Sequence, residues 1–224
     1  REVTGLDPMN VSMEIHTNMN PTVQAQLESI QAGTAGIDFP DDLYELGSIV
    51  INNQTGEIVG IMGGRNWASG GSMLLDHATE QFNQPGSAIK PVLDYALAFE
   101  DLGWATSHTV VDKPVTYGNW TFNNFDNTKW GVVDLSKAVG LSLNSVAINA
   151  LQAVIDKSGV QRVTNYLTSL GFSQFKPELF DISFAIGGGN MRVSAKELAA
   201  ATGVLINGGN YIKPHTINTI FYRN

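Results

Sequence analysis

The spacing of apolar residues changes near residue 46 and divides the chain into two predicted segments. In the first, residues 13–20 are predicted to form a strand with a polar end, and residues 22–31 a helix that follows a proline. Glycine and proline then indicate a loop. We expect residues 1–45 to form an interdomain linker or small subdomain, and residues 46–224 to form the main domain.

The main domain begins with two short apolar runs that are rich in β-branched residues. They occupy 48–51 and 57–62, and a polar, Gly-containing stretch separates them, so we predict a β-hairpin. An apolar helix is predicted over 87–102, ended by Gly103. Residues 104–130 contain aromatic side chains scattered among Asn and Thr, a pattern typical of a loop.

Helical periodicity returns in the second half of the chain. The last of these helices is bounded by a capping box at Ser194 and Glu197 and by Gly208 as its stop signal. A strand-like stretch, 211–222, follows. Strands first, helices in the middle and a strand last predict an α+β fold, an antiparallel sheet flanked by helices with a helical subdomain. The predicted helices are 135–139, 146–157, 160–170 and 194–206.

Composition excludes several kinds of function. Thirteen Lys and Arg against twenty-one Asp and Glu give a net charge of -8, which argues against a nucleic-acid partner. The chain has no cysteine, so disulfides, thiolate zinc ligands and a cysteine nucleophile are excluded. The four histidines are dispersed, and we predict neither a metal site nor a cofactor. No apolar run approaches the roughly 18 residues of a membrane-spanning helix.

The most specific candidate for chemistry is Ser87 with Lys90. Residues three apart on a helix lie on one face, within reach of each other. A serine hydroxyl becomes a nucleophile when a neighbouring base takes its proton, and a lysine whose pKa is lowered by burial is such a base. Taken alone, however, Ser-x-x-Lys is most often a solvated helix face.

A second candidate lies 55 positions further on, at Ser142-Leu143-Asn144. Residues two apart on a regular helix point in nearly opposite directions. Ser142 and Asn144 therefore face one cleft only if this segment is a turn before the next helix, with Leu143 pointing into the core. The alternative is that Ser142 and Asn144 are simple helix caps.

The two motifs in this order resemble the transpeptidase domain of class A penicillin-binding proteins, the bifunctional enzymes that build peptidoglycan. The likeness covers about 46–220, and residues 11–45 are similar to the family's interdomain linker. The expected fold is the penicillin-binding/β-lactamase-like one. Further segments that carry the resemblance are Gly47-Ser48-Ile49-Val50-Ile51, Thr55 to Gly64, Gln84-Pro85-Gly86-Ser87, Ala185-Ile186-Gly187-Gly188, Glu197-Leu198-Ala199 and Asn207-Gly208-Gly209 with Lys213-Pro214.

The resemblance implies a role for each motif residue. Ser87 would be the acyl nucleophile and Lys90 its general base, with Ser142 as proton shuttle and Asn144 as ligand of the substrate amide. The backbone N–H of Ser87 would form half of an oxyanion hole. We also expect Trp120 and Gly188 to contact the substrate, although aromatic packing under a long loop is the simpler interpretation for Trp120 and its neighbours.

The implied reaction is acyl transfer between peptidoglycan stem peptides that end in D-Ala-D-Ala, and β-lactam antibiotics would trap the nucleophile. The implied location is the extracytoplasmic face of a bacterial membrane. A glycosyltransferase domain and a membrane anchor are expected elsewhere in the parent protein. A remaining C-terminal polypeptide is expected to carry the third family motif, a strand with Lys-Thr/Ser-Gly.

Some residues depart from the family pattern. The only match to the third motif is Lys157-Ser158-Gly159, which comes too early in the chain and is predicted to be the cationic end of a helix. Leu143 stands where a polar residue is frequent, and Ser145 where a small apolar one is usual.

These departures keep two alternatives open. One is a penicillin-recognising sensor or degenerate scaffold that does not cross-link. The other is a class A β-lactamase with Glu178 as its deacylating carboxylate. This alternative is less favoured, because the residues after Glu178 do not match that family.

Overall fold

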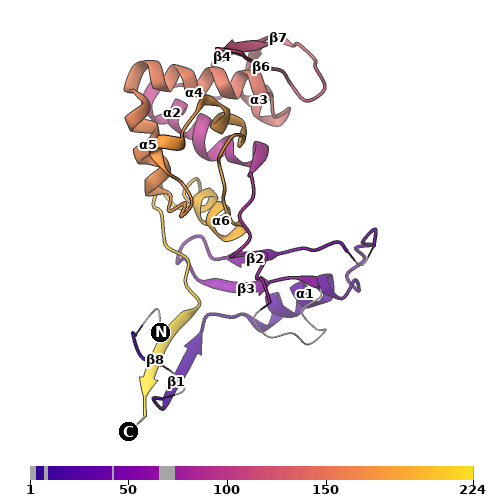
Figure 1. Cartoon of the computed structure of the whole chain (residues 1–224), viewed down its shortest axis with the longest axis vertical. Helices are drawn as coiled ribbons and strands as arrows, with labels where there is room; N and C mark the ends of the chain where they lie inside the picture. The colour runs from indigo at the N-terminus through magenta and orange to yellow at the C-terminus, as the bar shows by residue number, and fades with distance from the viewer. Residues whose placement is uncertain (1–3, 8–9, 42, 66–73, 224) are drawn as a thin grey trace. The chain divides into compact units, whose positions relative to one another are not determined.

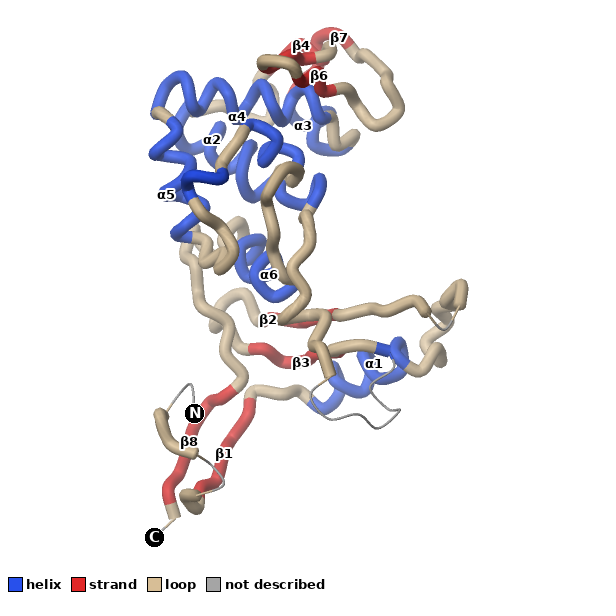
Figure 2. The backbone as a smooth tube through the Cα atoms, viewed as in Figure 1, coloured by secondary structure: helices blue, strands red, loops and turns tan. Residues whose placement is uncertain are grey.

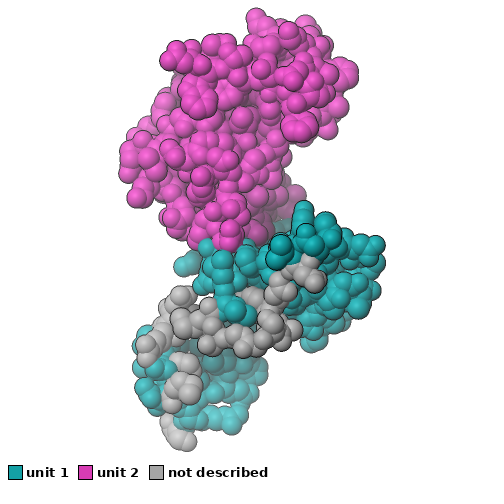
Figure 3. Space-filling view, turned by 45° about the vertical axis from the view of Figure 1, so that its right-hand side comes forward, with its two compact units in different colours: residues 1–80, 212–224 teal, residues 81–211 magenta. Residues whose placement is uncertain are grey.

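The computed structural model describes residues 4–7, 10–41, 43–65 and 74–223. The chain forms two compact units, one made of Arg1–Glu80 with Ile212–Asn224 and the other of Gln81–Tyr211 (Figures 1 and 3). This division differs from the boundary expected near residue 46. The reason is that the chain's last strand pairs with a strand of the segment that was expected to be a linker.

In its described residues, the first unit contains two antiparallel strand pairs and one α-helix (Figure 1). Strand β1 (Met13–Thr17) pairs with β8 (Ile217–Tyr222), so the two ends of the chain meet in one sheet. Strands β2 (Ser48–Ile51) and β3 (Ile58–Met62) form the predicted hairpin. Helix α1 (Pro21–Gln31) contacts β3.

Glycine permits the close contact between α1 and β3. A Cβ atom added at Gly60 would lie 2.8 Å from Val23 Cγ1 and 3.0 Å from Leu27 Cδ1. Asn20 caps the helix, because its side chain accepts from the backbone N–H groups of Thr22 and Val23. The predicted helix is confirmed within one residue, while the predicted strand 211–222 begins only at Ile217.

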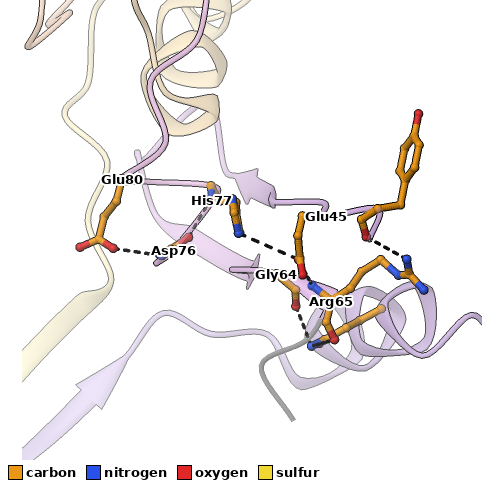
Figure 4. Close-up of polar contacts among 9 residues, drawn as sticks. Glu45, Gly64, Arg65, Asp76, His77 and Glu80 are labelled. Carbon is orange, nitrogen blue, oxygen red and sulfur yellow. Dashed lines mark hydrogen bonds and ion pairs between the residues drawn. The ribbon is translucent and has the colours of Figure 1, made fainter. Parts of the chain in front are cut away.

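A polar cluster joins the segment before β2 to the segment after β3 (Figure 4). The backbone N–H of Arg65 donates to Glu45 Oε2 at 2.9 Å, and its Nη1 donates to the Tyr44 carbonyl at 2.8 Å. His77 Nε2 lies 4.0 Å from the same Glu45 oxygen. The Glu45 carboxylate, before β2, thus contacts Arg65 and His77, which both follow β3, and links the two ends of the hairpin.

The second unit is mainly helical and is built around α4 (Asn144–Ser158) (Figure 2). Residues 146–148, 150, 151 and 154 of α4 are fully buried, and the helix packs against α2 (Ala96–Leu102) and the 3₁₀ turn η5 (Ile182–Ile186). The remaining α-helices are α3 (Leu135–Gly140), α5 (Val160–Ser169) and α6 (Ala195–Gly203), and three further 3₁₀ or π elements are given below. The helices predicted at 135–139, 146–157 and 160–170 are confirmed with small shifts in their ends.

The single helix predicted over 87–102 is wrong, because this segment has three different helical forms. A 3₁₀ turn, η2 (Gly86–Ile89), is followed by a π-helical turn, η3 (Pro91–Tyr95), and only then by α2. Proline has no N–H and its ring collides with the carbonyl four residues earlier, so Pro91 cannot continue a regular α-helix from Ser87. The Tyr95 N–H instead reaches back five residues to the Lys90 carbonyl at 3.2 Å.

The prediction that 104–130 is loop is also wrong. Strand β4 (Thr109–Asp112) pairs with β7 (Gly131–Asp134), and β5 (Val115–Tyr117) pairs with β6 (Trp120–Phe122). Strands of three or four residues are too short to produce a recognisable alternation of apolar and polar positions. All four strand pairs in the described residues are antiparallel, and the mixture of helices and antiparallel pairs confirms the α+β class.

The predicted capping box of the last helix is confirmed, but the predicted end of this helix, at residue 206, is not. Ser194 Oγ accepts from the Glu197 N–H at 3.2 Å, and Glu197 Oε2 accepts from the Ser194 N–H at 3.1 Å. Helix α6 ends at Gly203, and residues up to 206 continue as tight turns with bonds between residues three apart. The apolar pattern therefore extended past the helix.

No helix in the described residues has the length and apolar content needed to cross a bilayer.

Candidate active site

Ser87 lies in the 3₁₀ turn η2 of the second unit, and its side chain is exposed. Gly187 contacts this turn, because its carbonyl accepts a hydrogen bond from the Gly86 N–H at 3.3 Å. A Cβ atom at Gly187 would lie 2.2 Å from the Gly86 carbonyl oxygen, and the φ of +65° at Gly187 also favours glycine. The backbone of Gly187 thus packs directly against the backbone of Gly86 and fixes the position of the turn that carries Ser87.

Lys90 is almost entirely buried, with 2% of its surface exposed. Its Nζ donates to the Ser142 carbonyl at 2.6 Å and to Asn144 Oδ1 at 2.6 Å, and lies 3.2 Å from Ser142 Oγ. The first two partners can only accept. A neutral amine has two N–H groups, which these acceptors occupy, and its lone pair is then free for a hydroxyl proton. The site therefore suits an uncharged amine that acts as a base.

The segment Ser142-Leu143-Asn144 has the geometry required for both polar side chains to face Lys90. Ser142 adopts a φ of +53°, which is unusual for a residue other than glycine. Leu143 is 3% exposed, points into the core and occupies the cap position of α4, and Asn144 is the first residue of that helix. The side chains of Ser142 and Asn144 contact Lys90 instead of capping the helix.

Burial lowers the pKa of Lys90 from 10.5 to about 8, because an ammonium group is poorly solvated there. Asp94 opposes this shift by its charge. Asp94 is itself fully buried, and within the described part of the chain neither of its carboxyl oxygens has a hydrogen-bond partner. Burial therefore raises the pKa of Asp94 well above its usual value, and the charge of Lys90 opposes that rise. The two buried groups lie one helical turn apart, and in each of them burial outweighs the charge of the other.

Ser87, Ser142 and Asn144 line one pocket with a volume of about 350 Å³. Its wall is partly apolar, which excludes water from part of the site. The other lining residues are Asn124, Phe125, Asp126, Trp130, Leu141 and Leu143.

Two predicted substrate contacts lie elsewhere. Trp120 is 71% exposed and does not line this pocket, nor does Gly188, which packs beside Ser183. Of the other aromatic residues of this stretch, Tyr117 and Phe122 pack against the hydrophobic core, and Trp130 lines the pocket. Contact of Trp120 and Gly188 with a substrate stays a prediction.

The remaining sequence candidates do not reach the pocket. Lys157 is in the last turn of α4, as predicted, and its Nζ donates to the Asp101 carbonyl. Glu178 is exposed in the short 3₁₀ turn η4 (Pro177–Leu179). Neither residue lines the pocket of Ser87, and no three metal-ligating side chains cluster within the described ranges.

Sequence analysis missed a buried polar network next to the pocket. Asp112, 1% exposed, accepts from Asn124 Nδ2, from the Trp130 N–H and from Ser145 Oγ. Asn124 in turn accepts from the backbone N–H of Asn144. Asp112 ends a short apolar run, and at such a position the sequence does not distinguish a buried acidic residue from an exposed one. Only Ser145, a departure from the family pattern, gave a signal.

Residues 47–223 match the family model of the penicillin-binding protein transpeptidase domain. The chain belongs to this family. The match covers the four residues of the motifs, the whole of the second compact unit and about half of the first, so the resemblance inferred from the motifs is confirmed.

Curated relatives extend the similarity over nearly the whole chain. Penicillin-binding protein 1A/1B of Bacillus subtilis is 30% identical over 222 residues, which are 98% of this chain and 23% of that protein. Penicillin-binding protein 1A of Streptococcus oralis is 29% identical over 225 residues, 98% of this chain and 35% of that protein. The chain thus spans a quarter to a third of the length of these relatives.

Solved structures of the family have the same fold. Penicillin-binding protein 1A from Haemophilus influenzae has a TM-score of 0.67 and 27% identity, covering 80% of this chain and 26% of that one. The PonA1 protein from Mycobacterium tuberculosis in complex with penicillin V has a TM-score of 0.79 and 18% identity, covering 99% of this chain and 59% of that one.

The lowered pKa of Lys90 predicts how acylation depends on pH in this penicillin-binding domain. The predicted base is the neutral amine of Lys90, whose fraction grows as the pH rises through about 8. We expect the second-order rate constant for acylation by a fluorescent penicillin to rise with pH with a midpoint near 8. A rate that is constant from pH 6 to pH 9, or that rises only near the ordinary lysine value of 10.5, would contradict this.

The raised pKa of Asp94 predicts that Asp94→Asn stabilises the fold. The folded protein keeps a proton that the unfolded chain releases above its ordinary pKa of 3.8, so stability falls as the pH rises above that value. Asn does not titrate, and the variant should have a higher melting temperature at pH 7, with a smaller difference at pH 4. The exposed Asp156→Asn is the matched control, with no such dependence expected. An Asp94→Asn variant that is less stable than the parent at pH 7 would refute the assignment.

Proposed function

We propose that the chain carries the acyl-transfer centre of a serine D,D-transpeptidase, which cross-links peptidoglycan stem peptides through an acyl-enzyme on Ser87. The observation that supports this most strongly is the contact of buried Lys90 Nζ with Ser142 and Asn144, in a site that Ser87 shares. Membership of the transpeptidase family gives the reaction class.

The first step is attack by Ser87. Its Oγ–H proton passes to the lone pair of Lys90, and Oγ forms a bond to the carbonyl carbon of the penultimate D-Ala. The carbonyl oxygen becomes an oxyanion, for which the Ser87 backbone N–H is one donor. A neutral lysine is required at this point, and a pKa of about 8 leaves a useful fraction of neutral amine near pH 7.

Collapse of the oxyanion breaks the bond to the terminal D-Ala. The leaving nitrogen needs a proton, which Lys90 supplies through the Ser142 hydroxyl, 3.2 Å from Nζ. An amine of a neighbouring stem peptide then attacks the Ser87 ester and gives up a proton to Lys90 through the Ser142 hydroxyl. The bond between the acyl carbon and Ser87 Oγ breaks, Lys90 returns the proton to Oγ, and the cross-link is formed. Asn144 orients the substrate amide in this scheme, while its Oδ1 holds Lys90.

A β-lactam would follow the first step and stop there. Its ring amide mimics the D-Ala-D-Ala bond, and the leaving nitrogen stays tethered to the acyl group. Glu178 is exposed and does not line the pocket, so we propose no deacylating carboxylate and no lactamase activity. The ester on Ser87 should therefore be long-lived.

The proposed setting is the extracytoplasmic face of a bacterial membrane, with a glycosyltransferase domain in the same protein. We further propose that a polypeptide segment with the Lys-Thr/Ser-Gly strand completes the site by binding the substrate's terminal carboxylate. These assignments follow from the family and from the named relatives, which are penicillin-binding proteins of bacteria.

Labelling of the full-length protein with a fluorescent penicillin tests the proposal. Peptide mapping should find one adduct, on Ser87, and Ser87→Ala should lose labelling by at least about a thousandfold. Lys90→Arg should lose labelling comparably, because a guanidinium stays charged and cannot accept the proton. The exposed Ser169→Ala, in α5, is the matched control and should label normally.

Two results would overturn the proposal. Labelling that persists in Ser87→Ala would mean that another residue is the nucleophile. Labelling of Ser87 without cross-linked product, when the protein is supplied with lipid-linked peptidoglycan, would favour a penicillin-recognising sensor or scaffold instead.

A further inference from the structure

Asp112 is a buried carboxylate that the proposed reaction does not use. It is the last residue of β4 and is 1% exposed. Its oxygens accept from Asn124 Nδ2 at 2.9 and 3.0 Å, from the Trp130 N–H at 2.8 Å, and from Ser145 Oγ. Buried polar groups are stable only when such partners are present, so one carboxylate fixes three separate segments of the second unit.

Asn124 extends this network to the beginning of α4. Its Oδ1 accepts from the backbone N–H of Asn144 at 2.8 Å, and its Nδ2 also donates to the Thr128 carbonyl at 3.0 Å. The first N–H groups of a helix have no partner within the helix, and Asn124 supplies one here. Asp112 and the Thr128 carbonyl together hold the Nδ2 group of Asn124, which leaves its Oδ1 directed at the start of α4.

The Asn144 side chain is held at both ends. Its Nδ2 donates to the Asn123 carbonyl at 2.9 Å, and its Oδ1 accepts from Lys90 Nζ at 2.6 Å. An unbroken path of hydrogen bonds therefore runs from Asp112 through Asn124 and Asn144 to Lys90. Asn124 and Trp130 also line the pocket that Ser87 lines.

We infer that Asp112 is a positioning residue for acyl transfer, which holds the amide of Asn144 against Lys90 and the pocket wall in place through Asn124 and Trp130. The inference rests on the proposed function, since it assigns Asp112 a part in acylation of Ser87. Asp112 itself touches neither the substrate nor the reacting atoms.

The substitution Asp112→Asn tests this inference, because it keeps the shape but exchanges one acceptor oxygen for an NH₂ donor. That group would face an N–H donor of Asn124 or Trp130, and the bridge to Asn144 would loosen. Second-order acylation of Ser87 should fall roughly 10- to 100-fold, the usual effect of losing a supporting partner or of a small displacement at a reacting centre.

A double-mutant cycle distinguishes positioning from simple loss of stability. If Asp112 acts through Asn144, Asp112→Asn should slow acylation strongly in the parent but by no more than about twofold in an Asn144→Ala background. The acylation rates are measured with fluorescent penicillin on the full-length protein, below each variant's melting temperature. The matched control is Asp134→Asn, which alters the exposed N-cap of α3 on the neighbouring strand β7 and should leave the rate within about twofold.

Each outcome decides the question. Full additivity in the cycle, or an Asp112→Asn rate equal to the parent's, would overturn the inference while leaving Ser87 as the nucleophile. If Asp112→Asn shows no cooperative unfolding transition, Asn124→Ala replaces it in the same cycle, and additivity there overturns the inference equally. Failure of the proposed function looks different, because the parent itself would then not be labelled on Ser87.

Discussion

The acyl-transfer chemistry that we propose for this domain depends on the removal of one lysine amine from water. Lys90 is 2% exposed, and its Nζ contacts two groups that can only accept, the Ser142 carbonyl and Asn144 Oδ1. Desolvation penalises the ammonium form and lowers the pKa to about 8, so a base is available near neutral pH. The charge of the second buried group, Asp94, opposes this shift, but desolvation of the lysine has the larger effect.

Unusual backbone geometry brings the reacting groups together. Pro91 ends the 3₁₀ turn that carries Ser87 and forces the following π-helical turn. The left-handed φ of Ser142 lets its side chain and that of Asn144 face the same lysine while Leu143 is buried. Such conformations cost of order 1–3 kcal/mol each and persist where the surrounding structure determines them. Here the packed helix α4 and the Asp112 network supply that support.

Sequence predicted what depends on local spacing and missed what depends on long-range contacts. The hairpin of β2 and β3, the capping box at Ser194 and the turn at Ser142 are local, and all three are present. Pro91 could have indicated that residues 87–102 do not form one regular helix. It could not have indicated that the segment beginning at Pro91 is a π-helical turn. Short strands such as β5 acquire their identity only by pairing, and Asp112 becomes a network centre only when Asn124 folds over it. Trp120 belongs to the aromatic stretch that also supplies pocket residues, but it is exposed and does not line the pocket, which depends on how the short strands fold.

A direct titration of Lys90 is the most decisive measurement. The full-length protein labelled with ¹³C at lysine Cε can be followed by NMR from pH 6 to pH 11, with the Lys90 resonance assigned by its loss in Lys90→Arg. The account predicts a midpoint near 8 for this resonance, below the ordinary lysine value of 10.5. A Lys90 midpoint at the value of the exposed lysines would contradict it, since the amine would then be charged whenever Ser87 is required to react.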